Sequence, residues 1–461
     1  MRAALLVVLS LAAGLAWSAD VSLPDYERVE LENGAVLLLS EKHDVPLIGL
    51  RAVIRGGSVT DPVDKAGLTE LLATVMQKGA GERSAAEFAA ATAGVGGRLS
   101  VSANFEAVAV SAEFLSRDAG LMIGLVSDVL LRPRLSEDEF DKERARATGL
   151  IKAAKDSDPN DLLSYYANGF LFGEHPYGSP SIGSESSLPG IEHEDLVEHY
   201  ENHFGGDRLI ISVVGDFDPA ALKARLVSAF GAWAPAAGDL PVVTAPDTAP
   251  GPRVLLIDKP GATQTYFWFG DKGVAIDYPQ RAELNLANTV FGGRFTSMLV
   301  TELRVKAGLT YRARSAVNQR SRSGSVMIQS FTETGTTIQT IDLAISVLGQ
   351  LHDGGLDDAM MASARNYIMG QFPPRLETGS AVARMLAFIE QYGLGRSYVD
   401  EYGAALAAAT SESVAASIGE VYPGRESLVF IIIGDADVIR DDVAKYGPVT
   451  EMSITEPRFR P

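Results

Sequence analysis

The segment VIRGGSVTDPVDKAGLTELLATVMQKG, Val53 to Gly79, decides how the first part of this chain folds. It begins as an apolar strand, turns at a pair of glycines, passes through a loop that contains proline, and continues as a helix. The apolar residues of this helix recur at the i, i+3, i+4, i+7 spacing of one buried face, and they are Leu68, Leu71, Leu72 and Val75. The Lys78-Gly79 pair then indicates the end of the helix.

The composition is that of a folded protein with more than one domain. The 461 residues are 46% hydrophobic and 21% charged, and this length allows two or more domains with ample cores. The formal net charge of -19, without a basic stripe, argues against nucleic-acid binding. Because the chain has no cysteine, disulfides, thiolate metal sites and lipid attachment through cysteine are excluded.

The first 18 residues have the pattern of a signal peptide. Arg2 supplies the charged start, residues 3–16 supply the apolar run, and Ala16-Trp17-Ser18 supplies a small-x-small cleavage site. Cleavage after Ser18 is preferred, because cleavage after Ala19 would place bulky Trp17 three positions back. An uncleaved anchor is the alternative, but the run is shorter than the roughly 20 residues that a span needs. We expect a periplasmic or secreted protein with no membrane span after cleavage.

An internal repeat indicates that the chain contains two copies of one fold. GGDRLIISVVGDFD, Gly205 to Asp218, matches GRESLVFIIIGDAD, Gly424 to Asp437, and each reads as a buried strand that ends in Gly-Asp. One offset of 219 positions relates Gly205 to Gly424 and Gly215 to Gly434. Chance recurrence of such a strand is the alternative. Between the copies, residues 234–252 contain five prolines and no apolar period, which predicts a linker.

We therefore expect an α+β protein of two homologous lobes, related by internal duplication, each a mostly antiparallel sheet with helices packed on one face. The expected boundaries are 1–18 for the signal peptide, 19–233 for the N-terminal lobe, 234–252 for the linker and 253–461 for the C-terminal lobe. In the second lobe, the pattern predicts helices over residues 281–291 and 296–306, and Tyr311 is expected to open a strand.

The Gly56-Gly57-Ser58 turn and the helix that follows resemble the zinc helix of the pitrilysin/insulinase metallopeptidases, the inverzincins. Active members carry H-x-x-E-H there, in which two histidines hold zinc and the glutamate activates the bound water. The five matching positions run from Gly67 to Leu71, so both histidines are absent. The third ligand of active members is a glutamate on a later helix, and the matching residues 146–151, RATGLI, contain no carboxylate. The resemblance predicts no catalytic zinc here, with Leu71 in the core and Glu70 a solvated helix residue.

A second segment, FGGRFTSMLVTELRVKAGLTY from Phe291 to Tyr311, resembles the family's stretch that ends in leucine-arginine and then glycine-leucine-x-tyrosine. The resemblance implies that Arg304 and Tyr311 project into a chamber and hold the bound peptide near the metal. An arginine offers a fork of donors for peptide carbonyls, and a tyrosine hydroxyl can donate to an oxygen that gains negative charge. An exposed helix arginine and a half-buried strand tyrosine are the alternative. Phe291 and Leu303 are assigned to the core.

Two weaker groups remain. His199 and His203 are four residues apart on a predicted helix and could share a metal, and solvated histidines at a helix end are the competing interpretation. A set of arginines near Tyr311 could line a path for acidic peptides, although a solvated sheet edge is the preferred interpretation; these are Arg312, Arg314, Arg320 and Arg322.

The resemblance covers nearly the whole mature chain and leaves three functions open. The preferred one is the zinc-free subunit of a heterodimeric peptidase, whose partner is a zinc-bearing insulinase-like chain encoded nearby and whose substrates are peptides. On this hypothesis the chain alone has no catalytic residue and no cofactor, Arg304 and Tyr311 bind substrate, and zinc belongs to the partner. The alternatives are an inert structural or peptide-binding subunit, and a self-sufficient metallopeptidase with an atypical metal site such as His199 and His203.

Overall fold

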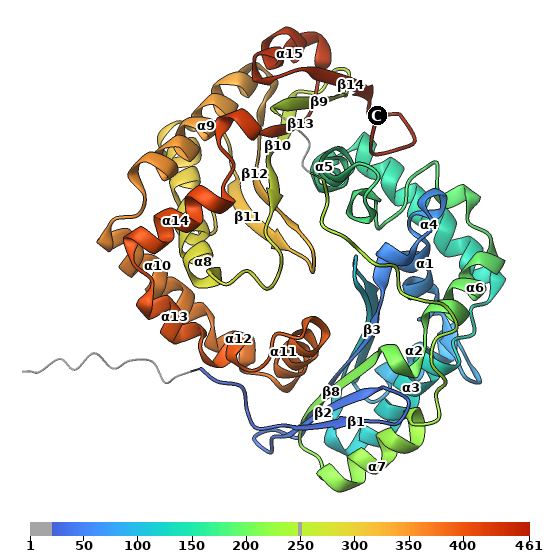
Figure 1. The fold of residues 1–461 in the computed structure, drawn as a ribbon. Coiled ribbons are helices and arrows are strands. Elements are labelled where there is room, and N and C mark those ends of the chain that lie inside the picture. The colour runs from blue at the N-terminus through green and yellow to red at the C-terminus, as the bar shows by residue number, and fades with distance from the viewer. Residues whose placement is uncertain (1–20, 248–250) are drawn as a thin grey trace, which may run out of the picture.

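The computed structural model describes residues 21–247 and 251–461. The expected signal peptide and residues 248–250 of the expected linker lie outside the described residues. Two six-stranded sheets form the centres of two lobes, with most helices on the outside (Figure 1). No helix in the described ranges is both long enough and apolar enough to cross a bilayer.

The first sheet has the order β1-β2-β8-β3-β7-β6. Its β2–β8 pair is parallel and the other neighbours are antiparallel. The strands are β1 (Glu27–Glu30), β2 (Val36–Glu41), β3 (Leu47–Arg55), β6 (Arg98–Ala103), β7 (Ala107–Leu115) and β8 (Leu209–Gly215). The helices that follow them in this lobe are α1 (Leu68–Val75), α2 (Ala85–Ala93), α3 (Ala119–Leu131), α4 (Glu137–Asp156), α6 (His193–His203) and α7 (Pro219–Phe230).

The second sheet has the order β11-β12-β10-β13-β9-β14. The strands are β9 (Arg253–Asp258), β10 (Gln264–Gly273), β11 (Ala313–Gln319), β12 (Gly324–Glu333), β13 (Val429–Gly434) and β14 (Val449–Ser453). The main helices are α8 (Arg281–Phe291), α9 (Thr337–Gly354), α10 (Asp358–Gln371), α13 (Tyr402–Ala408), α14 (Ser411–Val421) and α15 (Ala436–Val443). Each central strand thus has a counterpart in the other sheet, and the repeated segments are β8 and β13. The expected two-lobe α+β fold with an internal duplication is confirmed.

The two copies differ at one sheet edge. In the first lobe the edge next to β2 is filled by β1, which precedes it in the chain and runs antiparallel to it. In the second lobe the matching edge next to β9 is filled by β14, which comes from the C-terminal end and runs parallel to β9. The duplication therefore reproduces the sheet centre more closely than its margin.

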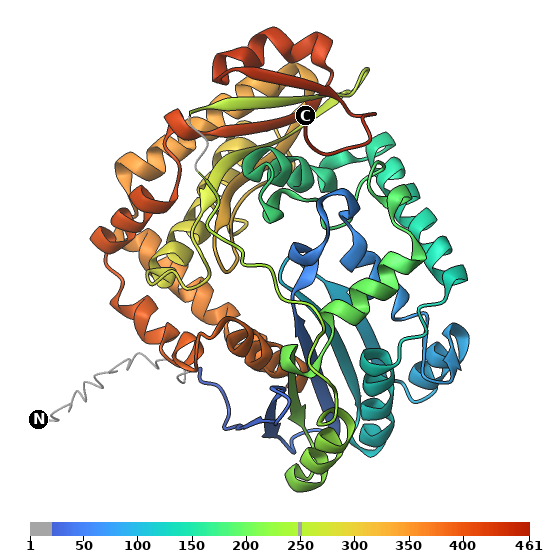
Figure 2. The same ribbon diagram turned by 45° about the vertical axis from the view of Figure 1, so that its right-hand side comes forward.

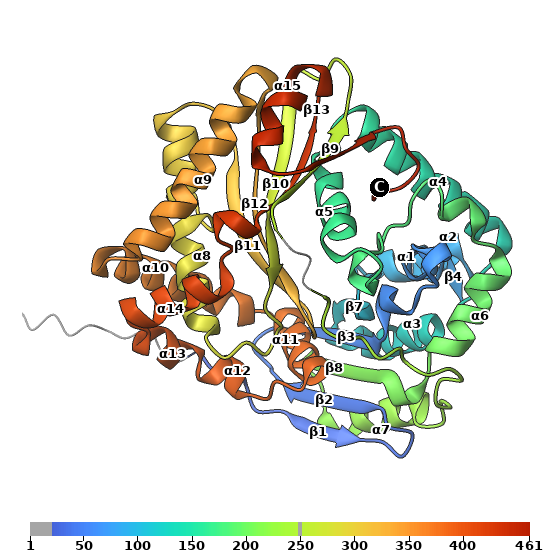
Figure 3. The ribbon, with the colours of Figure 1, turned by 45° about the horizontal axis from the view of Figure 1, so that its top comes forward.

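The central strands β8 and β13 are buried at every position, so both faces of each sheet must be covered. On the inner face, the covering helix comes from the other half of the chain. The helix α11 (Gly379–Tyr392) packs on β3 and β8 of the first sheet, and α5 (Leu163–Phe172) packs on β10 and β13 of the second (Figures 1 and 3). The expectation of helices on one face is therefore incomplete, because the halves exchange one helix each.

This exchange is tightly packed. Leu386 of α11 is fully buried in the same apolar cluster as Val53 and Ile210 of the first sheet. In β3, Gly49 permits close approach, since a Cβ there would lie 2.6 Å from the backbone nitrogen of Ser380. Each buried aliphatic side chain at such a contact contributes roughly 1.5–3 kcal/mol, so the exchanged helices hold the two lobes together.

The turns of two hairpins also meet between the lobes. The guanidinium of Arg320, in the β11–β12 turn, lies 4.1 Å from the ring centre of Phe105 and 4.8 Å from that of Tyr177. Beside it, the carboxylate of Glu106 accepts hydrogen bonds from the Ser321 amide at 3.1 Å and from the Tyr392 hydroxyl at 2.8 Å. Burial lowers the pKa of Arg320 to about 10. The interpretation of Arg320 as part of a solvated sheet edge is therefore wrong, because this side chain fills an interlobe contact.

The C-terminal residues return to the first lobe (Figure 2). Phe459 is 2% exposed, and its ring centre lies 4.9 Å from that of Tyr166 on the exchanged helix α5. Lys155 donates a hydrogen bond to the Glu456 carbonyl at 2.6 Å. The tail therefore adds a third set of contacts between the two halves.

Candidate functional site

The two positions that match the family's histidines are closed to metal by backbone and packing as well as by side-chain type. The helix α1 begins at Leu68, so Gly67 lies just before it, with φ +96° in the left-handed region. A Cβ at Gly67 would lie 2.6 Å from the Cα of Gly183. Leu71 is 3% exposed in the core, as expected. Neither position can present a nitrogen ligand.

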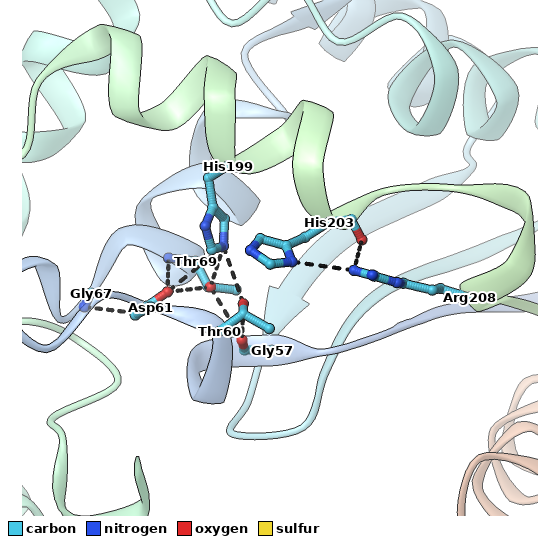
Figure 4. A network of polar contacts seen from close by, with 8 residues as sticks. All are labelled: Gly57, Thr60, Asp61, Gly67, Thr69, His199, His203 and Arg208. Atoms are coloured by element: carbon cyan, nitrogen blue, oxygen red, sulfur yellow. Dashed lines mark hydrogen bonds and ion pairs between the residues drawn. The ribbon is translucent and has the colours of Figure 1, made fainter. Parts of the chain in front are cut away.

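A buried carboxylate sets the start of α1 (Figure 4). Asp61, with a side chain that is 2% exposed, accepts hydrogen bonds from the Gly67 and Thr69 amides, both at 3.0 Å. It also accepts one from the Thr69 hydroxyl at 2.5 Å. These bonds satisfy donors that the first helical turn leaves unpaired. Burial is the dominant effect on the Asp61 carboxyl and raises its pKa to about 7.

His199 on α6 extends this network (Figure 4). Its Nε2 lies 2.9 Å from the Thr69 hydroxyl. Because that hydroxyl donates to Asp61, the ring must donate to it from Nε2, which fixes the neutral tautomer. His199 is only 5% exposed, and burial, together with the neighbouring His203, lowers its pKa to about 3. The interpretation of His199 as a solvated helix-end residue is therefore wrong.

The His199 and His203 pair does not complete a metal site. The two ring centres are 4.6 Å apart, but Arg208 lies beside His203, with its Nη1 3.2 Å from Nδ1. Burial and this guanidinium lower the pKa of His203. Within residues 21–247 and 251–461, no group of three or more potential ligands from histidine, cysteine, aspartate and glutamate could hold a metal ion. The network connects α6 to the start of α1 through Thr69 and Asp61.

A pocket lies between α1 and α4, where the family's metal-binding positions map. Its volume is about 420 Å³. Most of its lining is apolar, and the residues that form it are Gly67, Glu70, Leu71, Thr74, Glu143, Arg146, Ala147, Leu150, Ile151, Ala154, Asp161, Leu162, Tyr165, Ile182 and Leu188. We call this cavity the α1 pocket. In the sequence, the only indication of this pocket is the segment from Arg146 to Ile151, which has apolar residues where active relatives have the third metal ligand.

Glu70 faces the α1 pocket and is half-buried. Burial raises the pKa of its carboxyl, and a hydrogen bond from the Ala103 amide only partly opposes this. The expectation of a solvated residue is wrong, because α4 and β6 enclose this face of the helix. The other glutamate of the pocket, Glu143, is paired with Lys78 at 2.8 Å and with Arg146 at 3.3 Å. Although burial opposes it, these two cations lower the pKa of Glu143.

The second-lobe residues singled out from the sequence lie together. The Arg304 guanidinium carbon is 4.4 Å from the ring centre of Tyr311 and 4.9 Å from that of Phe295. Tyr311 is 74% exposed and Phe295 is 68% exposed. Phe291 and Leu303 are fully buried, as expected. Phe295 carries no motif signal in the sequence, since a single exposed aromatic residue has no periodicity.

The local backbone around Arg304 differs from expectation. Residues Val300–Lys306 form a π-helix, with the Ala307 amide bonded to the Glu302 carbonyl at 3.0 Å. Tyr311 lies outside any strand, since β11 begins at Ala313. The expected strand at Tyr311 is therefore wrong. Gly308, at φ +65°, ends the π-helix and turns the chain so that Tyr311 returns over Arg304.

Comparison with known proteins identifies relatives over most of the chain. The model for insulinase (peptidase family M16) matches residues 36–183, and the model for the peptidase M16 inactive domain matches residues 190–368. An uncharacterized zinc protease of Mycobacterium tuberculosis is 28% identical over 345 residues, which are 74% of this chain and 78% of the relative. A protein named non-peptidase homolog YmxG of Helicobacter pylori is 24% identical over 349 residues, 75% of this chain and 79% of that one.

Solved structures share the fold. A structure described as the peptidase M16 inactive domain of Pseudomonas fluorescens superposes with a TM-score of 0.83 at 22% identity, covering 89% of this chain and 98% of the other. A structure described as a protease from Helicobacter pylori gives a TM-score of 0.81 at 18% identity, covering 89% of this chain and 100% of that one. These structures therefore share the fold of this chain over most of its length.

Proposed function

This chain belongs to the insulinase (M16) family of peptidases, and from this premise we propose that it is the zinc-free subunit of a two-chain peptidase. Its partner would be a zinc-bearing insulinase-like chain, encoded nearby, and the two would enclose one chamber for peptides. On this proposal Arg304 and Tyr311 bind the substrate, no cofactor belongs to this chain, and the mature protein is exported after cleavage behind Ser18.

The observation that carries the proposal is the contrast between the two lobes. In the first lobe, the histidine positions are the left-handed Gly67 and the buried Leu71. In the second lobe, the Arg304 guanidinium is stacked on two exposed rings, and no hydrogen bond or ion pair to another described residue occupies its donors. The donors of such a guanidinium are available to the carbonyl oxygens of a bound peptide.

The chemistry of this chain in the pair would be positioning. A partner site of the zinc type supplies an activated water, and this chain supplies donors from the opposite side of the chamber. Arg304 would hold a backbone carbonyl of the peptide, and the Tyr311 hydroxyl would donate to the oxygen that gains charge. An extended peptide would add to a sheet edge of the partner. Consistent with this assignment, the Val101 carbonyl on the edge strand β6 of this chain already accepts a bond from Gln77 at 3.0 Å.

Reconstitution tests the proposal. The mature chain would be mixed with the product of the neighbouring insulinase-like gene and assayed with a fluorogenic peptide. We expect little cleavage by either chain alone and strong cleavage by the mixture. Arg304→Ala or Tyr311→Phe should lower kcat/KM by about 10²-fold, as loss of one transition-state donor does, while size-exclusion chromatography shows an intact pair. Arg312→Ala, an exposed arginine next to Tyr311, is the matched control and should have little effect.

A second candidate, an inert structural or peptide-binding subunit, is favoured by the relative in Helicobacter pylori, which is named a non-peptidase homolog. Full activity of the partner alone, with no change on adding this chain, would establish that candidate and reject the first. Mass spectrometry of the exported protein's N-terminus tests cleavage behind Ser18.

A further inference from the structure

We infer that the α1 pocket binds the side chain of a basic residue, lysine or arginine, presented by a peptide. The inference goes beyond the proposed function, because it concerns the first lobe and needs no partner chain. It rests on the volume of the pocket, on its lining and on the half-buried Glu70 carboxylate, which has no cation partner among the described residues.

The lining suits an aliphatic stem. A volume of about 420 Å³ falls within the range of pockets that hold small ligands, roughly 300–1,000 Å³. Leu71 and Ile151 form part of its wall and are both 3% exposed, whereas Leu150 is 60% exposed. An aliphatic chain inside the pocket would cover Leu150 and remove apolar surface from water.

The charges of the lining suit a cationic head group. The charged residues are Glu70, Glu143, Asp161 and Arg146, and one of these carboxylates, Glu143, is already paired with Arg146. Glu70 has no ion-pair partner among the described residues. The one hydrogen bond that lowers the pKa of its carboxyl comes from the Ala103 amide. Burial, Glu70 and Asp161 raise the pKa of Tyr165, which also lines the pocket. A carboxylate in such a poorly solvated position attracts a cation more strongly than it would in water.

Lysine and arginine satisfy both requirements, because their stems are apolar and their heads are charged. A purely apolar side chain would leave the Glu70 carboxylate desolvated without a partner, which is costly. An acidic ligand would meet three carboxylates and one paired guanidinium. A metal ion finds no set of three ligands in the described residues. The occupant that fits is therefore a basic side chain.

Two matched probes test this inference on the intact mature chain. Nα-acetyl-lysine amide and Nα-acetyl-norleucine amide have the same four-carbon stem and differ by the ammonium group. Their affinities would be measured by NMR titration of the leucine and isoleucine methyl groups, which report directly on the pocket wall. We expect the lysine probe to bind at least tenfold more tightly than the norleucine probe. In Glu70→Gln the preference should disappear while norleucine binding changes by less than twofold.

Controls separate a local effect from misfolding. Glu137→Gln, on the exposed start of α4 and outside the pocket, should keep the full lysine preference. On the unmodified chain, lysine affinity should fall as the pH is lowered and Glu70 is protonated, whereas norleucine affinity should not. Equal binding of the two probes, binding of neither, or a lysine preference that survives Glu70→Gln would each overturn the inference.

Discussion

Replacing Gly67 should destabilise the protein more than replacing a matched glycine elsewhere. The control is Gly96, which also has a positive φ, +69°, but has nothing within 4 Å of an added Cβ. Gly96→Ala therefore bears only the cost of a left-handed alanine, about 1–2 kcal/mol. Gly67→Ala bears the same cost and also places its Cβ 2.6 Å from the Cα and 2.7 Å from the nitrogen of Gly183. Because these are backbone atoms, they cannot rotate away, and overpacking adds about 1–3 kcal/mol.

The measurement is urea unfolding of both variants, followed by far-UV circular dichroism. We expect the midpoint to fall for both and to fall further for Gly67→Ala, by a difference of about 1–3 kcal/mol in the free energy of unfolding. Equal losses for the two variants would refute the conclusion that the loop around Gly183 fills the space of the first ligand.

The same geometry makes a prediction about metal. Gly67→His combined with Leu71→His restores both nitrogens of the family motif but not the helix start that would present them. We expect no stoichiometric zinc after dialysis against micromolar zinc, by elemental analysis of folded protein. One zinc per chain would show that backbone rearrangement at position 67 is easy, and the argument from packing would fail.

Three further outcomes follow from other contacts. Thr69→Val removes the hydroxyl between Asp61 and His199 and leaves both buried groups without that hydrogen-bond partner, which should lower the free energy of unfolding by about 1–3 kcal/mol. A loss under about 0.5 kcal/mol would show that these hydrogen bonds do not stabilise the fold. The pKa of His199 is about 3 when folded, against 6.5 unfolded, so its contribution to stability is complete above pH 6.5 and is lost as the pH falls. The pKa of Asp61 is raised to about 7 from 3.8, so its protonation in the folded state stabilises the fold as the pH falls and opposes the effect of His199. Between about pH 4 and 6.5 the two contributions should nearly cancel, and wild-type stability should be nearly independent of this pair. In acid denaturation series, Asp61→Asn should lose up to about 1.4 kcal/mol of unfolding free energy per pH unit. Glu106→Gln weakens the acceptor of the Ser321 amide, which should exchange with deuterium at least tenfold faster, while unchanged exchange would mean that other contacts hold the hairpins.

The sequence predicts this fold well where periodicity and repetition carry the information. A buried strand ending in Gly-Asp occurs twice, and the structure places both copies, β8 and β13, at the centre of a sheet. Periodicity shows which face of a strand is apolar but not which element covers it, so the exchange of α5 and α11 had no signal. The swap of β14 for β1 at the edge is hidden for the same reason.

The candidate site was predicted in part. Leu71 followed from the helical stripe, because burial of that stripe depends on local spacing. The environments of Glu70, His199 and Arg320 were misjudged, because each depends on a neighbour from a distant part of the chain: β6 and α4 for Glu70, α1 for His199 and the first-lobe turn for Arg320. The sequence pattern around a polar residue of a helix or strand does not show which distant segment packs against it.

The exchanged helices have a consequence for the covalent structure of the molecule. Residues 234–247 contain no helix or strand, and Val242 among them is 86% exposed. A single proteolytic nick there would leave α5 seated on the second sheet and α11 seated on the first, so the two fragments should migrate together until denaturant is added. Neither fragment expressed alone would be complete, because its sheet would lack the covering helix that the other fragment contributes. The two exchanged helices would then hold the native protein together, and the connecting peptide would matter more for folding than for the stability of the folded state.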